Sequence, residues 1–360
     1  MKKAVLRFRK SSAFAGFILF AIALVLNIVV QGPASFFSVR SINTLFAKNI
    51  PFILVCISQS FLLISGTMDI SCGIQLALVN VVTIMTYQEW GLAFPLCCAL
   101  GILSAIVASL VCWACCSVIR LPALLASYAL TYVIKGVNVL IMDVPQGKVP
   151  KEFYKAYDSQ LFGFIPVSIF ALVLVALVWL YLRRTRFAKN IYAVGGNPRN
   201  AYATGIDPMK VQFQAFLLKG FIVGVAGICL TLMIAAGNPL QAEDYGIRSL
   251  SACILGGLTF GGWGSVACGV FGAGFYTLIS NSVYYIFTLL TKLIPGFSVS
   301  SYWQNFASDV IVFLGLLMTI VTAKNQREAL RQGIVRMVKR GERYDKPEVA
   351  PAEGGNVHED

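Results

Sequence analysis

Five ionisable side chains lie within segments that are otherwise strongly apolar: Asp69, Lys135, Lys219, Arg248 and Asp309. An ionisable group inside a membrane span is costly, so such residues are functional candidates by default. The carboxylates among them can accept hydrogen bonds or exchange protons, and the cations can donate hydrogen bonds. These five are therefore the first candidates for contact with a polar solute.

Asp69 lies in a short glycine-bounded segment, residues 66–73, directly before an apolar helix. Its carboxylate could cap the free N–H groups of that helix, or it could accept hydrogen bonds from a solute in a central cavity. Lys219 and Arg248 lie close enough to span ends for their side chains to extend to the membrane interface. We therefore give these two residues little weight as functional candidates. Asp309 lies six residues into the last span and needs a partner that the sequence does not identify.

Motifs of catalytic and metal chemistry are missing from the sequence. It has no G-x-x-x-x-G-K-[ST] phosphate loop and no G-x-S-x-G elbow. The only histidine is His358, so neither a Ser-His-Asp triad nor a histidine metal site is expected. Cys112, Cys115 and Cys116 have metal-like spacing but lie in an apolar helix, where a free cysteine packs as a small hydrophobe. We expect no enzyme, metal site or cofactor in this chain.

Composition places the chain in the membrane class. Of its 360 residues, 58% are hydrophobic and 12% are charged, and the mean hydropathy is +0.76. A soluble domain of this length needs more charge to cover its surface. The net charge of +13 comes from basic residues gathered at 2–10, 183–210 and 324–346, which all flank apolar spans. This is the positive-inside pattern rather than a nucleic-acid surface.

The hydropathy pattern predicts an all-α polytopic fold of about ten transmembrane helices, some of them broken. The expected spans lie near 11–31, 45–66, 71–88, 93–118, 122–142, 165–182, 212–235, 248–260, 264–290 and 303–322. Ten crossings from a cytoplasmic N-terminus return the C-terminus to the cytoplasm. We therefore expect one transmembrane domain over 1–322, a cytoplasmic loop at 183–211 within it, and a basic extension with a disordered tail over 323–360.

Glycines interrupt two of these segments, at 66–73 and 256–264. Irregular backbone at membrane depth is tolerated where it is buried in protein or lines a cavity, and such breaks often mark a transport pathway. Close helix packing is the alternative interpretation, because small residues let backbones approach. We favour the pathway at 66–73. Packing suits the glycines of two later spans: Gly220, Gly224, Gly227, Gly269, Gly272 and Gly274.

The loop at 183–211 contains the signals of a short helix bounded by turns. Asn197 can cap this helix with Pro198 at its first position. Gly205 can end it, and Asp207 with Pro208 can begin the next element. A short surface helix at this place is better suited to docking a partner than to linking two spans passively.

Five sequence fragments, in order, resemble the permease family of ribose-type and other simple-sugar ABC importers. They cover nearly the whole membrane region and read Gly66-Thr-Met-Asp69-Ile-Ser71-Cys-Gly73; Leu121-Pro122-Ala123; Tyr192-Ala-Val-Gly195-Gly196-Asn197 with Gly205-Ile206; Leu255-Gly256-Gly257 with Gly261-Gly262-Trp-Gly264-Ser265; and Ser301-Tyr302-Trp303-Gln304. The chain departs from the family pattern at Cys72, where valine is usual, and at Thr67-Met68.

The resemblance implies a multi-pass protein of the bacterial inner membrane that works in a larger assembly. The implied partners are a second permease copy, cytoplasmic ABC ATPase subunits that bind the ATP, an extracytoplasmic binding protein, and membrane lipid. It assigns a set of residues to the translocation pathway: Asp69, Ser71, Gly73, Trp303 and Asp309. It assigns a second set to coupling with the ATPase: Gly195, Gly196, Asn197, Arg199, Gly205 and Asp207.

The sequence alone leaves alternatives for the transported solute and for the transport mechanism. Similar permeases serve nucleosides, autoinducer-type furanosyl compounds and branched-chain amino acids. An ion-coupled secondary transporter would need carboxylates at the midplane, for which Asp69 and Asp309 are the candidates. A structural or signalling membrane protein would move no solute at all.

Overall fold

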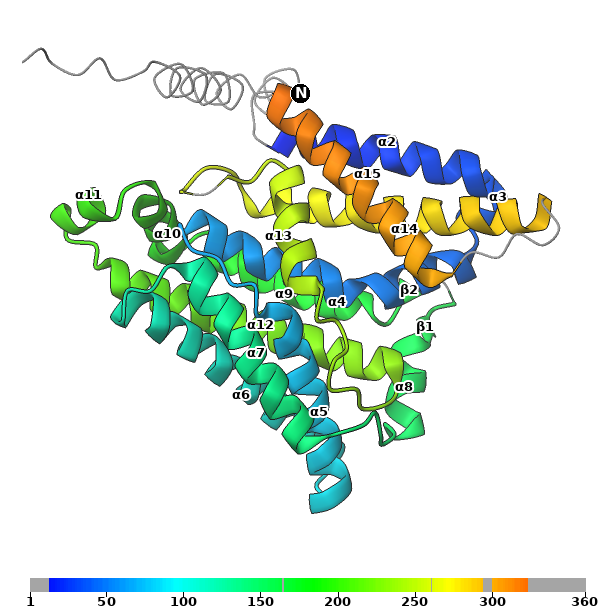
Figure 1. Cartoon of the computed structure of the whole chain (residues 1–360), viewed down its shortest axis with the longest axis horizontal. Coiled ribbons are helices and arrows are strands. Elements are labelled where there is room, and N and C mark those ends of the chain that lie inside the picture. The colour runs from blue at the N-terminus through cyan, green and yellow to red at the C-terminus, as the bar shows by residue number, and fades with distance from the viewer. Residues whose placement is uncertain (1–12, 164, 260, 294–299, 323–360) are drawn as a thin grey trace, which may run out of the picture. The chain divides into compact units, whose positions relative to one another are not determined.

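A computed structural model describes residues 13–163, 165–259, 261–293 and 300–322, and these are almost entirely helical (Figure 1). The elements are α2 (Ala13–Gln31), α3 (Pro33–Phe36), α4 (Val39–Ile64), α5 (Cys72–Trp90), α6 (Phe94–Trp113), the π-helical turn η1 (Ala114–Val118), α7 (Ala123–Ile141), α8 (Lys151–Asp158), β1 (Gln160–Leu161), β2 (Ile165–Pro166), α9 (Ile169–Leu182), α10 (Arg186–Gly196), α11 (Pro198–Ala203), α12 (Pro208–Ile234), α13 (Tyr245–Leu255), α14 (Val266–Leu293) and α15 (Ser301–Thr322). The chain forms two units, 1–313 and 314–360, and the boundary falls within α15. The elements from α2 to α14 and the first half of α15 all belong to the first unit.

Six of the described helices are long and apolar enough to cross a membrane: α2, α4, α6 continued through η1, α7, α12 and α14. A shorter apolar helix is α9. Each of the ten apolar segments predicted from the sequence corresponds to a helix, so the all-α prediction is confirmed. Ten crossings and cytoplasmic termini stay predictions, and the extension at 323–360 lies outside the described residues.

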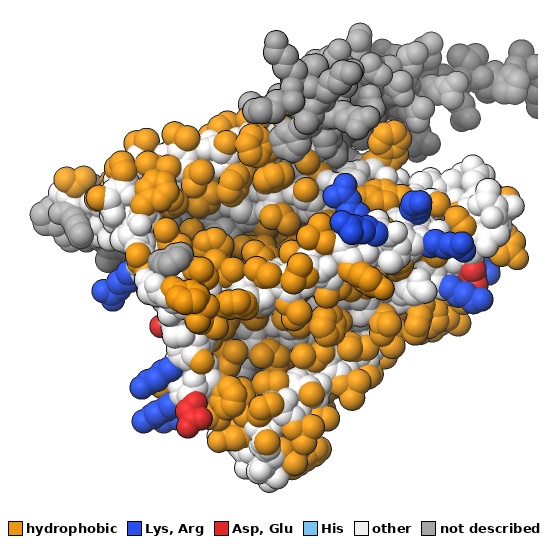
Figure 2. Space-filling view, turned by 180° about the vertical axis from the view of Figure 1, so that it is seen from behind, with side chains coloured by type: hydrophobic (Ala, Val, Ile, Leu, Met, Phe, Trp, Pro, Cys, Tyr) orange, Lys and Arg blue, Asp and Glu red, His pale blue; other side chains and the backbone are white. Residues whose placement is uncertain are grey.

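Helix α4 is the most deeply buried of the six candidate spans. It begins at Ser38, whose hydroxyl caps it by accepting a hydrogen bond from the Ser41 N–H at 3.2 Å. Most residues in the apolar windows of α2, α6 and α7 are not buried within the protein, and Leu140 of α7 is 88% exposed. Figure 2 shows broad hydrophobic surface between a few groups of charged side chains, as expected of a surface that faces lipid.

Small residues let α12 approach its neighbours closely. A Cβ on Gly220 would lie 2.8 Å from the Cα of Ile106, and one on Gly224 would lie 2.9 Å from the Cα of Ile102, both on α6. Gly227 faces Val79 of α5 in the same way. The interpretation of these glycines as packing positions is confirmed, because any side chain there would separate the helices.

The segment between α7 and α9 folds against the first half of α4. It contains α8 and the antiparallel pair β1–β2, in which Gln160 faces Pro166 and Leu161 faces Ile165. The Tyr157 hydroxyl donates to the carbonyl of Ala47 at 2.9 Å, and the Asn43 amide donates to the carbonyl of Asp158 at 2.9 Å. These two bonds fix the segment to α4.

Candidate functional site

Asp69 and Lys219 form an ion pair in the interior of the protein. The Lys219 Nζ lies 2.6 Å from the Asp69 Oδ2, and both side chains are 0% exposed. Lys219 comes from α12, and Asp69 comes from the irregular segment between α4 and α5. The pair therefore ties the first glycine break to a helix about 150 residues away in sequence.

Three uncharged side chains complete this cluster, which we call the ion-pair cluster (Asp69, Ser71, Gln75, Ser109 and Lys219). Lys219 also donates to the Gln75 Oε1 at 2.5 Å and to the Ser109 Oγ at 3.0 Å. The Gln75 amide donates to the Ser71 Oγ at 2.8 Å and to the Asp69 Oδ2 at 3.3 Å. Each charge thus has several hydrogen-bond partners, which a buried ion pair needs to offset its desolvation.

The sequence-based expectation that Lys219 extends to the membrane interface is wrong. Lys219 is the twelfth residue of α12, which begins at Pro208 rather than near residue 212. The side chain is fully buried and points at α5, α6 and the break before α5, as its contacts show. Periodicity did not reveal which face of α12 meets the break, so the partner of Asp69 was missed.

Asp69 organises the turn into α5. Its Oδ1 accepts from the Ser71 N–H at 2.8 Å and from the Ser71 hydroxyl at 2.5 Å, and α5 begins at the next residue, Cys72. This geometry supports the helix start, one of the two roles open from the sequence. The assignment of Asp69 to the pathway stays a prediction.

Asp309 finds its partners on two other helices. Its Oδ2 lies 3.3 Å from Arg248 of α13, and its Oδ1 accepts from the Tyr276 hydroxyl of α14 at 2.9 Å. Arg248 also lies 3.5 Å from Asp244. The Asp309 side chain is 47% exposed, so this group is accessible, unlike the ion-pair cluster.

The structure divides the residues assigned to the pathway into two places. Ser71 and Gly73 lie beside Asp69 and are buried. A Cβ on Gly73 would lie 2.6 Å from the carbonyl oxygen of Ala242, so this glycine serves close packing against the start of α13. Trp303 lies with Asp309 on α15 and is 62% exposed.

The loop at 183–211 contains the short helix predicted for it. Helix α11 has Asn197 as its cap, and the Asn197 Oδ1 accepts from the N–H groups of Arg199 and Asn200 at 3.0 and 3.1 Å. Gly205 follows with a φ of +84°, which favours glycine. Asp207 caps α12 by accepting from the Met209 N–H at 2.9 Å. The predicted boundaries of α11 are confirmed.

An additional helix, α10, precedes α11 and was not expected from the sequence. It buries Ala188, Ile191 and Val194 against the protein, while its first residue is Arg186. Burial raises the pKa of the Tyr192 phenol above its usual value. The spacing of the three buried residues at i, i+3 and i+6 could have indicated a helix.

Both glycine breaks meet the end of α10 at one point. A Cβ on Gly195 would overlap the carbonyl oxygen of Ile64, the last residue of α4, and would lie 2.9 Å from the Gly262 N. The Gly261 N–H lies 3.4 Å from the Leu63 carbonyl oxygen. We call this contact the glycine junction, made by residues 63–66, 195–196 and 261–262. Because these backbones touch without intervening side chains, no free space remains between the segments, and a shift of one must displace the others.

The cysteines contribute packing to this core. Seven of the ten are buried, and Cys98, Cys115 and Cys116 are partly buried. Among the residues that the structure describes, no group of three or more His, Cys, Asp or Glu side chains could hold a metal ion.

Comparison with known protein families identifies one that matches most of this chain. Residues 41–322 match the family model described as branched-chain amino acid transport system / permease component. The match covers the helices from α4 to α15, including both glycine breaks and the α10–α11 loop. The chain belongs to this permease family.

Several curated relatives resemble this permease over most of their length. The Galactose/methyl galactoside import permease protein MglC of Escherichia coli (strain K12) is 23% identical over 88% of this chain and 96% of its own. The Autoinducer 2 import system permease protein LsrC of Escherichia coli O9:H4 (strain HS) is 25% identical over 94% and 95%. The D-allose transport system permease protein AlsC of Escherichia coli (strain K12) is 27% identical over 70% and 78%. No solved structure matches this chain.

Family membership and the apolar helices make the chain a multi-pass inner-membrane permease of an ABC import system. Its relatives are permease components rather than catalytic subunits. The ion-pair cluster and the glycine junction are therefore to be understood as parts of a transport machine.

Proposed function

We propose that this permease forms the membrane pathway of an ATP-driven importer for a simple sugar such as galactose, ribose or a related monosaccharide. The observation that carries the proposal is the similarity to the galactose and D-allose import permeases, together with the family match over residues 41–322, which includes the α10–α11 loop and both glycine breaks. The galactose relative covers 88% of this chain and 96% of its own, which supports a shared pathway as well as a shared scaffold.

The proposed topology has ten crossings and places both termini in the cytoplasm. Helices α5, α9, α13 and α15 then cross in addition to the six long apolar helices, although α13 is short and continues into the glycine loop. The cluster of basic residues at 183–210 supports a cytoplasmic position for α10 and α11.

Helix α11 would dock onto the ATPase subunit, with Asn197, Arg199 and Gly205 shaping it and Asp207 starting α12. Exposure of Arg199 and Tyr202 supports a docking role, since neither side chain is used to pack the permease itself. A push on α11 would reach α10 and then, through Gly195, the end of α4 and the loop before α14. No ATP would bind to this chain.

The assembly would contain two permease copies, two ABC ATPase domains and an extracytoplasmic binding protein. The names of two relatives describe them as permease proteins of an import or transport system. The exposed apolar side chains of α6 and α7 leave surface for lipid or for a second permease copy. The binding protein would select the solute.

A furanosyl autoinducer is the second candidate substrate. The relative from the autoinducer 2 import system covers 94% of this chain at 25% identity, which is as good a match as the sugar permeases give. Such a compound is small and polyhydroxylated, so it would require the same kind of pathway.

The test is recovery of the tagged permease from its native membrane in mild detergent. We expect an ABC ATPase and a binding protein to copurify, and ATP hydrolysis by the complex to rise when the binding protein carries its sugar. A permease that copurifies with no ATPase would contradict the proposal. The ligand of the binding protein separates a monosaccharide from a furanosyl autoinducer.

A further inference from the structure

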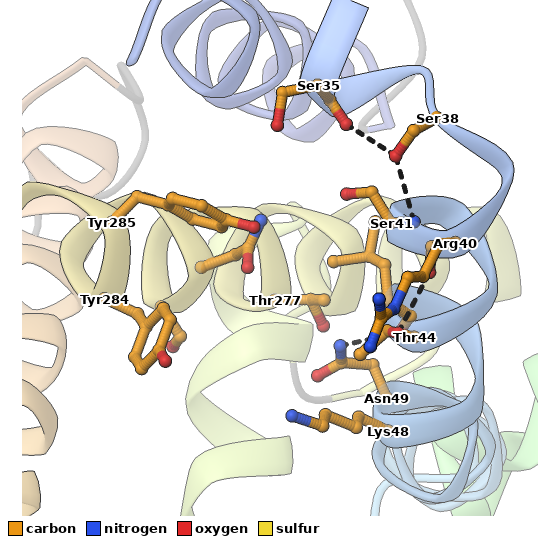
Figure 3. A pocket seen from close by; sticks show the side chains of 13 residues that line it. Ser35, Ser38, Arg40, Ser41, Thr44, Lys48, Asn49, Thr277, Tyr284 and Tyr285 are labelled. Atoms are coloured by element: carbon orange, nitrogen blue, oxygen red, sulfur yellow. Dashed lines mark hydrogen bonds between the residues drawn. The ribbon is translucent and has the colours of Figure 1, made fainter. Parts of the chain in front are cut away.

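A polar pocket of about 480 Å³ lies between the first half of α4, with the turn before it, and the middle of α14. Thirteen residues line it, and Leu45 is the one among them whose side chain has no polar atom. Figure 3 shows side chains from α4 and from α14 on opposite sides of the space. Both helices are candidate membrane spans, so this gathering of polar groups needs a reason.

Two helical stripes make the walls of this pocket, which we call the α4–α14 pocket. On α4, Arg40, Thr44 and Lys48 repeat every four residues and so share one face. On α14, Thr277, Asn281 and Tyr284 repeat at intervals of four and three residues. Each helix thus contributes a line of polar side chains to the pocket, whereas three other pockets among the described residues are lined mainly by apolar side chains.

Thr277 is the deepest of these polar groups and has no partner for its hydroxyl. The residue is 6% exposed, and its Oγ1 makes no hydrogen bond with the described residues. It is the twelfth residue of α14, so it lies about 17 Å along the helix, near mid-span. A buried hydroxyl without a partner is costly, and a bound solute would supply the missing bond once the Thr277 side chain turns toward the pocket.

The chemistry of the lining indicates the class of ligand. Hydroxyl and amide groups, which both donate and accept hydrogen bonds, make up most of it, and Tyr284 and Tyr285 add aromatic faces. Among the residues that the structure describes, no carboxylate lines the pocket. The two cations, Arg40 and Lys48, are exposed and lie at the rim. The volume is in the range of small-ligand sites.

The pocket and the glycine junction lie at opposite ends of the same two helices. Asn49, the last pocket residue of α4, is 15 residues or about 22 Å from Ile64 at the junction. Helix α14 begins at Val266, directly after the loop that carries Gly261 and Gly262. Both walls are therefore anchored where α10 touches the protein.

We propose that the α4–α14 pocket binds a neutral polyhydroxylated solute on the side of the permease opposite the α10–α11 loop. This inference rests on the proposed function and adds the place where the solute is held. The hydroxyls of the solute bond to the two polar stripes, Thr277 bonds to the deepest of them, and the rim cations donate to the outermost. Movement at the glycine junction would then part or close the two walls.

The first test removes the unpartnered hydroxyl alone. Thr277→Val keeps the side-chain volume and breaks no internal hydrogen bond, so we expect unchanged or higher thermal stability together with an about three- to tenfold higher KM for sugar uptake. Thr83→Val is the matched control, because Thr83 is also buried with an unpartnered hydroxyl but lies on α5 outside the pocket. Equal uptake by both variants and the wild type would overturn the proposal.

The second test measures occupancy in the assembled importer. Ser41→Cys places a thiol on the pocket wall, and Asp143→Cys places one on exposed surface outside it. With a membrane-impermeant thiol reagent and D-galactose as the probe, or the sugar found on the binding protein, we expect slower labelling at position 41 and an unchanged rate at 143. No protection at 41 in an importer that transports the sugar would overturn the pocket while leaving the proposed function intact.

A different occupant would give a different result in the same assay. The labelling rate at position 41 could depend on the anionic lipid content of the vesicles and be unaffected by sugar. That result would identify a lipid headgroup site and overturn the proposal. Failure of the wild-type importer to take up any sugar would contradict the proposed function itself.

Discussion

Helix α4 ends in two contrasting environments. At Ile64 its backbone touches Gly195 of α10, with no room for a side chain, and the break after it leads to the fully buried ion pair of Asp69 and Lys219. At its other end the helix lines a pocket of about 480 Å³ with exposed polar side chains. Near Ile64 the buried charges of Asp69 and Lys219 pair with each other. In the pocket the Thr277 hydroxyl has no hydrogen-bond partner among the described residues. This difference supports the two proposals made above, coupling at the glycine junction and solute binding in the α4–α14 pocket.

Breaking the ion pair should have the largest effect on stability. Lys219→Met leaves Asp69 as an uncompensated buried charge, so we expect a loss of about 3–5 kcal/mol in the free energy of unfolding. Thermal unfolding of the purified permease in detergent measures it. The Asp69→Asn/Lys219→Met double variant should recover part of the loss, because no buried charge remains. Wild-type stability in the single variant would contradict the role assigned to this cluster.

The glycine junction can be tested with two adjacent glycines. Gly195→Ala would overlap the Ile64 carbonyl, and we expect about 1–3 kcal/mol of destabilisation with a severe loss of ATP-driven uptake. Gly196→Ala is the control, since a Cβ there meets nothing within 4 Å. Abundance, unfolding temperature and uptake should separate the two variants. Similar behaviour of both would show that the contact has no role in coupling.

The docking helix should be sensitive to its cap. Asn197→Ala removes the acceptor for two N–H groups and should cost about 1 kcal/mol, while uncoupling ATP hydrolysis from uptake in the assembled importer. Asn197→Asp retains a good capping side chain and should stay coupled. The ratio of ATP hydrolysed to sugar imported is the measurement, and normal coupling in the alanine variant would contradict the assignment of α11.

The two carboxylates assigned to the pathway should differ most clearly in stability. Asp309→Asn weakens a partly exposed pair with Arg248, and we expect a change below about 1 kcal/mol. Asp69→Asn should lower stability by clearly more, because Lys219 is fully buried. Paired unfolding measurements check this order, and equal losses would remove the distinction between an accessible and a structural carboxylate.

Local signals in the sequence were sufficient for most of the long helices and for α11, but not for α10 or for the contacts between elements. Asn197 with Pro198 and Asp207 with Pro208 predicted helix starts that the structure confirms, because a cap acts within three residues. Lys219 was misjudged because burial depends on which helices face it, and its partner lies about 150 residues away. The meeting of the two glycine breaks at Gly195 depends on tertiary packing in the same way.

The candidate pocket was missed for a related reason. Each polar stripe of the α4–α14 pocket resembles the exposed face of an ordinary amphipathic helix when its segment is considered alone. Only the packing of α4 beside α14 turns two such faces toward one space.

Uptake of labelled sugar into vesicles that contain the complete importer is the most direct test of the central claim. We predict uptake that requires ATP at the α10–α11 face and continues when an ionophore collapses the proton gradient. Uptake that ignores ATP and stops with the gradient would contradict this claim and would identify an ion-coupled secondary transporter.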